Sequence, residues 1–488
     1  MFLRRIFRTR SDVPRHEEKP PARGGGWSLD GELLRFGAAV GGQPVGIPWT
    51  IRHACEGTAV FGATGSGKTS GTGQTIALSM LRAGFGGLVL CAKPDELRLW
   101  KRYAAATGRA GDLVVFSPES GAQFNFLDYE LRRAGRGSGI TENVVAVLMQ
   151  CAEIGGSGGQ GSDAIWEKAM RQLLRNAVDL CHLSGSTLRM DLIHRIALSG
   201  PEVEELLERA RQRGNELTAS ARDDLEAVKR YFLIEWANMA DRTRSGVIMS
   251  LTAICDPFLR GALRDLFCRE TTVTPEDAQR GKIIVIDLPV KTFNELGRYA
   301  AVVWKFLFQR AAERQEAPDR PMFIFADECQ LFVTSTDAVF QSTARSSRVA
   351  TVYLTQNLPN LHAELAGSGP AGKARVDALL GNLQTKIFHQ NSDPQTNQWA
   401  AETLARSLQS RGSTSGSVSM GQNGEPKPQA GASQQEAWEF EVAPREFLRM
   451  AKGGPDFDFV VTGMLFQGGR VFPNGRHWIE AAFTQGKE

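Results

Sequence analysis

The sequence has 488 residues and a mass of 53.3 kDa, enough for about two to four domains with a large buried core. Its 42% hydrophobic and 23% charged residues exclude a chain that is disordered throughout and a collagen-like one. The net charge is only +3, so any nucleic-acid contact must come from local basic patches. The seven cysteines are scattered, without C-x-x-C or paired histidine spacing, and we expect reduced, mostly buried thiols of a cytosolic protein.

The first 26 residues are expected to form a basic, flexible tail, because prolines and the run Gly24-Gly25-Gly26 precede a folded region starting near Trp27. Its first ten residues place four arginines among Phe2, Leu3, Ile6 and Phe7. This decapeptide could lie on an anionic membrane, touch nucleic acid, or be a solvated tail. Neither a transmembrane helix nor an export signal is expected, since glycine and proline interrupt the longest uncharged runs.

Short β-rich runs alternate with helix-length segments from Thr58 onward. The runs at 58–61, 86–92 and 112–116 are separated by the segments 69–81 and 95–106. This rhythm predicts a mostly parallel sheet with crossover helices, an α/β fold.

The segment between the first strand and the first helix fits G-x-x-x-x-G-K-[ST]. Its glycines let backbone N–H groups surround phosphate oxygens, Lys68 reaches the β- and γ-phosphates, and the Thr69 hydroxyl binds Mg²⁺. We therefore expect ATP and Mg²⁺ as cofactors, in a nucleotide-binding domain whose first part spans 27–127. The expected nucleotide-binding residues are Gly62, Ala63, Thr64, Gly65, Ser66, Gly67, Lys68, Thr69 and Ser70.

Strand signals disappear over 128–275, where helix formers with charged faces predict an all-α insertion domain. Within it, the Gly/Ser-rich segment 155–162 is expected to be a flexible loop. Strand and helix signals then alternate again over 276–488, the expected second part of the nucleotide-binding domain. In that part, the low-complexity segment 410–435 is expected to be a disordered loop, followed by a helix and a terminal hairpin turning at Gly468-Gly469.

The apolar run 322–326 ends in Asp327 and Glu328, in the form of a Walker B strand. Asp327 can bind Mg²⁺ directly or through water, while Glu328 polarises the attacking water, which favours a hydrolase over a kinase. Gln356 ends the next strand and is the candidate γ-phosphate sensor. Before that strand, Arg345 or Arg348 could supply an arginine finger to a neighbouring subunit, the alternative being a solvated basic turn.

These motifs, in this order, resemble the coupling-protein ATPases of type IV secretion and conjugation (TraG/TraD-type), within the FtsK/HerA class of P-loop motors. The resemblance spans roughly 58–405 and includes GGLVLCAKPDELRLW, VVFSPESGAQFNFLD and HQNSDPQTNQWAAETLA. The family's element of an arginine, ten residues and a glutamine matches Arg345 to Gln356, which favours Arg345 as the finger. The sequence departs from the family at Ala92, at Pro94-Asp95 and at Phe126.

The resemblance implies a RecA-like domain interrupted by an all-α domain, assembling as a homohexamer that translocates DNA. It also implies a relaxase or other cargo protein as partner of the all-α domain, together with type IV secretion components. The charged helices of that domain are either docking faces or simply solvated.

Family members usually carry N-terminal transmembrane helices, which are not expected here. This leaves open a cytoplasmic protein, membrane contact through the tail, or a separate anchor protein. The alternatives for function are a HerA-like DNA motor in repair or anti-phage defence, and a nucleotide-gated adaptor without translocation.

Overall fold

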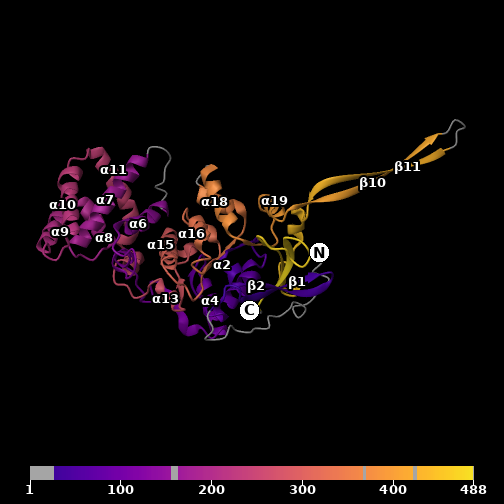
Figure 1. The fold of residues 1–488 in the computed structure, drawn as a ribbon, viewed down its shortest axis with the longest axis horizontal. Helices are drawn as coiled ribbons and strands as arrows, with labels where there is room; N and C mark the ends of the chain where they lie inside the picture. The colour runs from indigo at the N-terminus through magenta and orange to yellow at the C-terminus, as the bar shows by residue number, and fades with distance from the viewer. Residues whose placement is uncertain (1–26, 155–162, 367–369, 421–425, 487–488) are drawn as a thin grey trace.

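The computed structural model describes residues 27–154, 163–366, 370–420 and 426–486 (Figure 1). They form a large helix-covered sheet, with a helical domain at one end and a long hairpin at the other. The predicted tail at 1–26 and the predicted loop at 155–162 lie outside the described residues.

The centre of the sheet is a block of parallel strands, which confirms the predicted fold class. Within an 11-stranded sheet their order is β9-β3-β8-β7-β4-β6-β5. β6 follows the helical domain in sequence, yet it pairs with β4 and β5, which precede that domain, so two sequence-distant blocks form one sheet. The strands are β3 (Thr58–Phe61), β4 (Gly86–Leu90), β5 (Leu113–Phe116), β6 (Ile283–Ile286), β7 (Met322–Ala326), β8 (Val349–Thr355) and β9 (Thr385–Phe388).

Helices cover both faces of this block, so its strands are nearly continuous apolar runs. Side chains alternate between two hydrophobic clusters: Val60 and Val89 belong to one, Ala59 and Leu88 to the other. The first cluster contains side chains of α2 (Ile51–Cys55), α3 (Gln74–Arg82) and α4 (Glu96–Ala106). The second lies beneath α13 (Glu276–Gln279), α14 (Val290–Phe293), α15 (Glu295–Glu313), α16 (Asp337–Thr343), α17 (Leu358–Ala366), α18 (Pro370–Asn382) and α19 (Pro394–Thr403).

Four antiparallel strands extend the sheet beyond β9, in the order β12 (Val460–Gln467), β13 (Trp478–Thr484), β1 (Glu32–Val40) and β2 (Gln43–Thr50). The terminal hairpin is present, but residues 468–477 join its strands in place of a tight turn at Gly468-Gly469. The predicted helix before it is a short 3-10 segment, Pro444–Arg449. The β1–β2 hairpin had no clear sequence signal, because prolines and a glycine interrupt β2.

Between β5 and β6, the described residues form helices joined by loops and contain no strand. At the base of this helical domain, an isolated antiparallel bridge joins Phe124 to Thr271. In Figure 1 the domain lies at the end of the molecule remote from the hairpin. Its helices are α5 (Phe126–Arg132), α6 (Thr141–Ile154), α7 (Asp163–Leu183), α8 (Met190–Leu198), α9 (Gly200–Gln212), α10 (Ala219–Arg230), the π-helical segment Tyr231–Trp236, α11 (Asp241–Leu259) and α12 (Gly261–Phe267).

The prediction of a disordered loop at 410–435 is wrong for the described residues. β10 (Arg406–Met420) and β11 (Pro426–Phe440) pair antiparallel from Arg406↔Phe440 to Met420↔Pro426. These strands pair with each other and with no strand of the large sheet. Their Ser-, Gly- and Gln-rich sequence has no apolar pattern, so the pairing rests on backbone hydrogen bonds.

All seven cysteines are buried and unpaired, as predicted. Among the described residues, no single helix is long and apolar enough to cross a membrane. One pair, α11 with α12, has sufficient length and apolarity but is bent by 84°.

Candidate active site

The predicted phosphate-binding loop follows β3 and leads into a helix. Gly65 and Gly67 have φ of +73° and +82°, which favours glycine at both positions. A Cβ on Gly62 would lie 2.3 Å from Ser66 Oγ, so a side chain there would collide with the loop. The Ser66 hydroxyl is buried without a hydrogen-bond partner among the described residues, as expected of a loop shaped for an anionic ligand.

Three further predicted nucleotide-binding residues, Ala63, Thr64 and Ser70, differ in their contacts and exposure. The backbone N–H of Ala63 donates to the carbonyl oxygen of Gln390 at 2.9 Å, which joins the loop to the end of β9. Thr64 is exposed at the tip of the loop. Ser70 Oγ accepts a hydrogen bond from Gln485 Nε2 at 2.7 Å, so its described partner belongs to the C-terminal segment.

The helix begins with a π-helical turn, Lys68–Gly73, before α3. Thr72 Oγ1 in this turn lies 2.8 Å from His389 Nε2, and His389 Nδ1 lies 2.9 Å from the carbonyl oxygen of Thr462. Burial lowers the pKa of His389 to about 4 despite its bond to Thr462, so the ring is neutral near pH 7. His389 thus ties the P-loop helix to β12, a role that no sequence motif signals.

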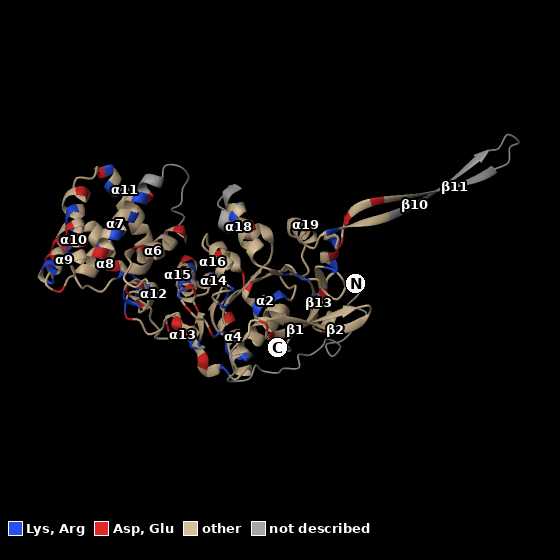
Figure 2. Ribbon diagram, in the orientation of Figure 1, with Lys and Arg blue, Asp and Glu red and all other residues tan. Residues whose placement is uncertain are grey.

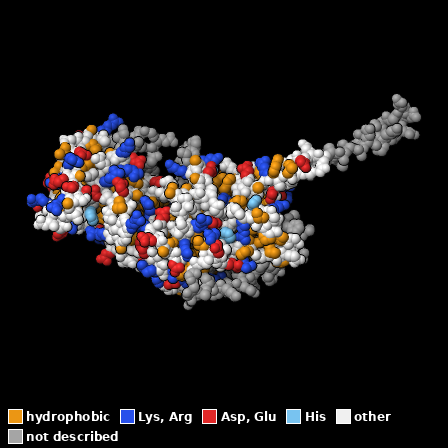
Figure 3. All heavy atoms as spheres, in the orientation of Figure 1, with side chains coloured by type: hydrophobic (Ala, Val, Ile, Leu, Met, Phe, Trp, Pro, Cys, Tyr) orange, Lys and Arg blue, Asp and Glu red, His pale blue; other side chains and the backbone are white. Residues whose placement is uncertain are grey.

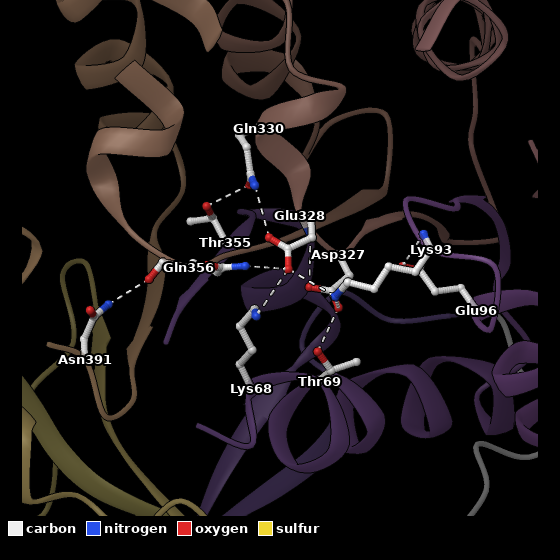
Figure 4. A network of polar contacts seen from close by, with 10 residues as sticks. All are labelled: Lys68, Thr69, Lys93, Glu96, Asp327, Glu328, Gln330, Thr355, Gln356 and Asn391. Atoms are coloured by element: carbon white, nitrogen blue, oxygen red, sulfur yellow. Dashed lines mark hydrogen bonds and ion pairs between the residues drawn. The ribbon is translucent and has the colours of Figure 1, made fainter. Parts of the chain in front are cut away.

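The Walker B carboxylates reach the P-loop because β8 alone separates β3 from β7, and all three strands run parallel. Thr69 Oγ1 donates to Asp327 Oδ2 at 2.8 Å. A hydroxyl beside a carboxylate supplies the oxygen ligands that Mg²⁺ prefers. The two predicted metal ligands therefore lie together (Figure 4).

Glu328 is buried at the centre of a polar cluster (Figure 4). Its φ of +51°, unusual for a residue with a side chain, places it in the left-handed region, as is common at functional sites. Oε1 lies 3.7 Å from Lys68 Nζ and 3.1 Å from Lys93 Nζ. Burial opposes ionisation, but Lys68, two glutamine amides and Lys93 outweigh it and hold the pKa of Glu328 at about 2.

Two amides fix the orientation of this carboxylate. Gln356 Nε2 donates to Glu328 Oε1 at 3.1 Å, and Gln330 Nε2 donates to Oε2 at 3.0 Å. Thr355 Oγ1 donates to Gln330 at 2.9 Å, while Asn391 Nδ2 donates to the carbonyl oxygen of Gln356 at 2.7 Å. The predicted sensor therefore contacts Glu328 directly, and Gln330 is a site residue that the sequence reasoning missed.

Lys93 was also missed as a site residue, although it follows the buried strand β4. β4 pairs with β7 in the register Leu90↔Ala326, which brings Lys93 to the carboxylates. Its Nζ lies 3.4 Å from Asp327 Oδ2 as well as 3.1 Å from Glu328 Oε1. The sequence signal is a lysine just beyond the end of a strand adjacent to Walker B.

Neither predicted finger residue reaches the P-loop of its own chain. Both precede β8, whereas Gln356 follows it, so the arginines lie at the opposite edge of the sheet. Arg345 has a 58% exposed side chain and pairs with Glu56 at 3.2 Å. Arg348 has a φ of +52° and donates to the carbonyl oxygens of Trp27 and Asp319 at 2.6 and 2.9 Å. Of the two, Arg345 therefore has the guanidinium that is more accessible to a neighbouring subunit.

Comparison with known proteins gives a structural likeness. No family model and no curated protein sequence matches the chain. The unbound monoclinic form of the bacterial conjugative coupling protein TrwBdeltaN70 is similar at a TM-score of 0.60 and 15% identity, covering 96% of this chain and 90% of that one. Its trigonal form with sulphate gives 0.61 and 16%, covering 95% and 97%. TrwB with ADP and Mg²⁺ gives 0.60 and 15%, covering 95% and 96%. The chain therefore has the RecA-like P-loop fold of the conjugative coupling protein TrwB.

Proposed function

We propose that this chain is an ATP-hydrolysing motor of the conjugative coupling type. The observation that carries the proposal is the placement of Glu328, which is oriented by Gln356 and Gln330 beside Lys68 and the Thr69–Asp327 pair. This arrangement suits hydrolysis, because a fixed carboxylate lies beside the P-loop lysine that binds the phosphates.

The residues fit ATP and Mg²⁺. The glycine-shaped loop suits a polyphosphate, as does the Ser66 hydroxyl, which has no partner within the described part of the chain. Thr69 with Asp327 would hold the metal ion. Solved structures of TrwB contain ADP with Mg²⁺ and the ATP analogue ADPNP. When bound, Mg²⁺ supplies compensation for phosphate charge and orients the phosphate oxygens.

Each residue of this chain has a defined part in the proposed reaction. Lys68 and the backbone N–H groups of the P-loop bind the β- and γ-phosphates. Glu328 accepts a hydrogen bond from the attacking water and orients it. Gln356 holds Glu328 in place and couples the end of β8 to the presence of the γ-phosphate.

The finer proposal is a hexameric DNA translocase that recruits DNA or a relaxase–DNA substrate for type IV secretion, acting in the cytoplasm or at the inner membrane. Five large apolar side chains exposed on the described part of the helical domain support a protein partner there: Ile140, Leu198, Leu233, Ile234 and Met249. The charges on its helices lie next to opposite charges (Figure 2), as in the pairs Arg211–Glu208 and Lys229–Glu226. Locally paired charges favour the solvated alternative for these faces.

Two substitutions test the hydrolytic site. Lys68→Ala should weaken ATP binding at least about tenfold, because it removes the cation that faces the phosphates. Glu328→Gln should still bind ATP but lose at least about 100-fold in turnover, since an amide cannot accept the proton of water. Phosphate release and binding of a fluorescent ATP analogue measure the two effects. A Glu328→Gln protein with near wild-type turnover contradicts the assignment.

DNA stimulation separates a translocase from an adaptor. On the face drawn in Figure 3, basic side chains are interspersed with acidic ones, so binding must use local clusters. We expect DNA of either strandedness to raise ATPase activity several-fold at about 50 mM salt, and the effect to vanish near 200 mM as phosphate contacts are lost. A hexameric preparation that neither binds DNA nor responds to it at low salt favours protein cargo or a regulatory role.

A further inference from the structure

Among the described residues, Lys93 is one of two lysines whose ammonium groups lie beside the Walker B carboxylates. Two carboxylates, Asp327 and Glu328, lie opposite two ammonium groups, those of Lys68 and Lys93. Glu328 has ion pairs with these two lysines in the described part of the chain, and the contact with Lys93 is the shorter one, at 3.1 against 3.7 Å. Figure 4 shows the two lysines approaching the carboxylates from different elements.

We propose that Lys93 is a positioning residue for Glu328. The proposal rests on the proposed function, in which Lys68 binds the phosphates of ATP. Once Lys68 is engaged in this way, Lys93 is the one cationic partner that Glu328 keeps among the described residues. Lys93 then balances its charge and, with Gln356 and Gln330, holds its carboxylate toward the attacking water.

The backbone of Lys93 is fixed by a buried carboxylate. Glu96 is 7% exposed, and its two oxygens accept hydrogen bonds from the N–H groups of Lys93 and Ala92, each at 3.2 Å. The N–H of Lys291 donates to the carbonyl oxygen of Ala92 at 3.1 Å, which joins this segment to the residues after β6. The segment therefore presents Lys93 from a fixed point, while the side chain itself is 38% exposed and can change partners.

Lys93 also contacts Asp327, a predicted Mg²⁺ ligand, and should therefore affect Mg²⁺ binding. Lys93 Nζ lies 3.4 Å from Asp327 Oδ2, the same oxygen that accepts from Thr69. A cation at this position repels a divalent ion from Asp327. Removing Lys93 should therefore strengthen Mg²⁺ binding while it weakens catalysis, whereas a merely structural defect would weaken both.

The experiment compares Lys93→Met, Lys93→Arg and Lys101→Met, the last replacing an exposed lysine of α4 as a matched control. For Lys93→Met we expect kcat to fall at least about 30-fold with KM for ATP within about threefold, because the lost contact acts on the orientation of Glu328. The Mg²⁺ midpoint for binding a fluorescent ATP analogue should fall about tenfold. Lys93→Arg should retain most activity, and Lys101→Met should match the wild type.

A double substitution separates a positioning role from direct contact with phosphate. In a Glu328→Gln background, Lys93→Met should cause no further loss of the residual rate, because Lys93 acts through Glu328. A further loss overturns the positioning role, as does a wild-type kcat for Lys93→Met, or a joint fall of kcat, Mg²⁺ affinity and melting temperature. If Lys68→Ala and Glu328→Gln themselves retain turnover, the proposed function fails. If they abolish it and Lys93→Met does not, only this inference fails.

Discussion

The buried environment of His389 should make the stability of the fold depend on pH. It lies between the P-loop helix and β12, 1% exposed, with both ring nitrogens engaged. Burial lowers its pKa to about 4, below the usual 6.5. The unfolded chain therefore binds more protons between these pH values, so this contribution to stability is present above pH 6.5 and is lost as the pH falls toward 4.

We therefore expect acidification from pH 7 to about 4.5 to destabilise the wild type more than His389→Gln, with linkage from this group worth up to about 3 kcal/mol. At pH 7 the variant should be less stable by about 1 to 2 kcal/mol, because one of two buried hydrogen bonds is weakened. Melting temperatures at several pH values measure both effects. His477→Gln, at an exposed position, is the control, and equal pH profiles for wild type and His389→Gln contradict the prediction.

Among individual residues, those that lie in continuous sequence motifs could be predicted as site residues. Residues that come into contact only when the chain folds could not. Lys68, Thr69, Asp327 and Glu328 were predictable because strand ends place short motifs at one edge of a sheet. Lys93 and Glu328 are 235 residues apart in sequence, and Thr72 and His389 are 317 apart. Such contacts depend on which strands become neighbours, which no local pattern states.

At the scale of elements, strands buried on both faces were the easiest to predict. β4, β6 and β7 are short, continuous apolar runs ending near polar residues, and β8 departs from this pattern only by two threonines. Burial on two faces requires such a pattern. The β10–β11 hairpin was missed for the opposite reason. The sequences of its two strands carry no continuous apolar face, so there is no hydrophobic alternation to detect.

Side-chain contacts across the two strands are present at the base of this hairpin. Leu408 and Trp438 lie opposite each other and are 51% and 66% exposed. Next to them, the Arg406 guanidinium lies over the ring of Phe440 at 4.1 Å. Cross-strand pairs of this kind contribute about 0.2 to 1 kcal/mol each, which adds to backbone pairing at the base.

At the scale of the whole molecule, the single sheet separates Arg345 from the nucleotide site of its own chain. β8 has 7 residues, so its two ends lie roughly 20 Å apart. A head-to-tail ring is the arrangement that would bring Arg345 of one subunit to the P-loop of the next. Arg345→Ala should then lower kcat about 10³-fold with nucleotide affinity nearly intact. Arg348→Ala should mainly reduce stability, because that guanidinium holds the carbonyl oxygens of Trp27 and Asp319.

Mixing inactive subunits tests this shared site. An Arg345→Ala subunit keeps an intact Lys68, and a Lys68→Ala subunit keeps an intact Arg345. Where the two meet in the right order, one complete site forms, so the mixture should recover part of the ATPase activity that each variant lacks alone. Phosphate release across mixing ratios should peak at an intermediate ratio. Mixed rings that are demonstrated by mass and remain inactive at every ratio contradict a finger supplied by the neighbouring subunit.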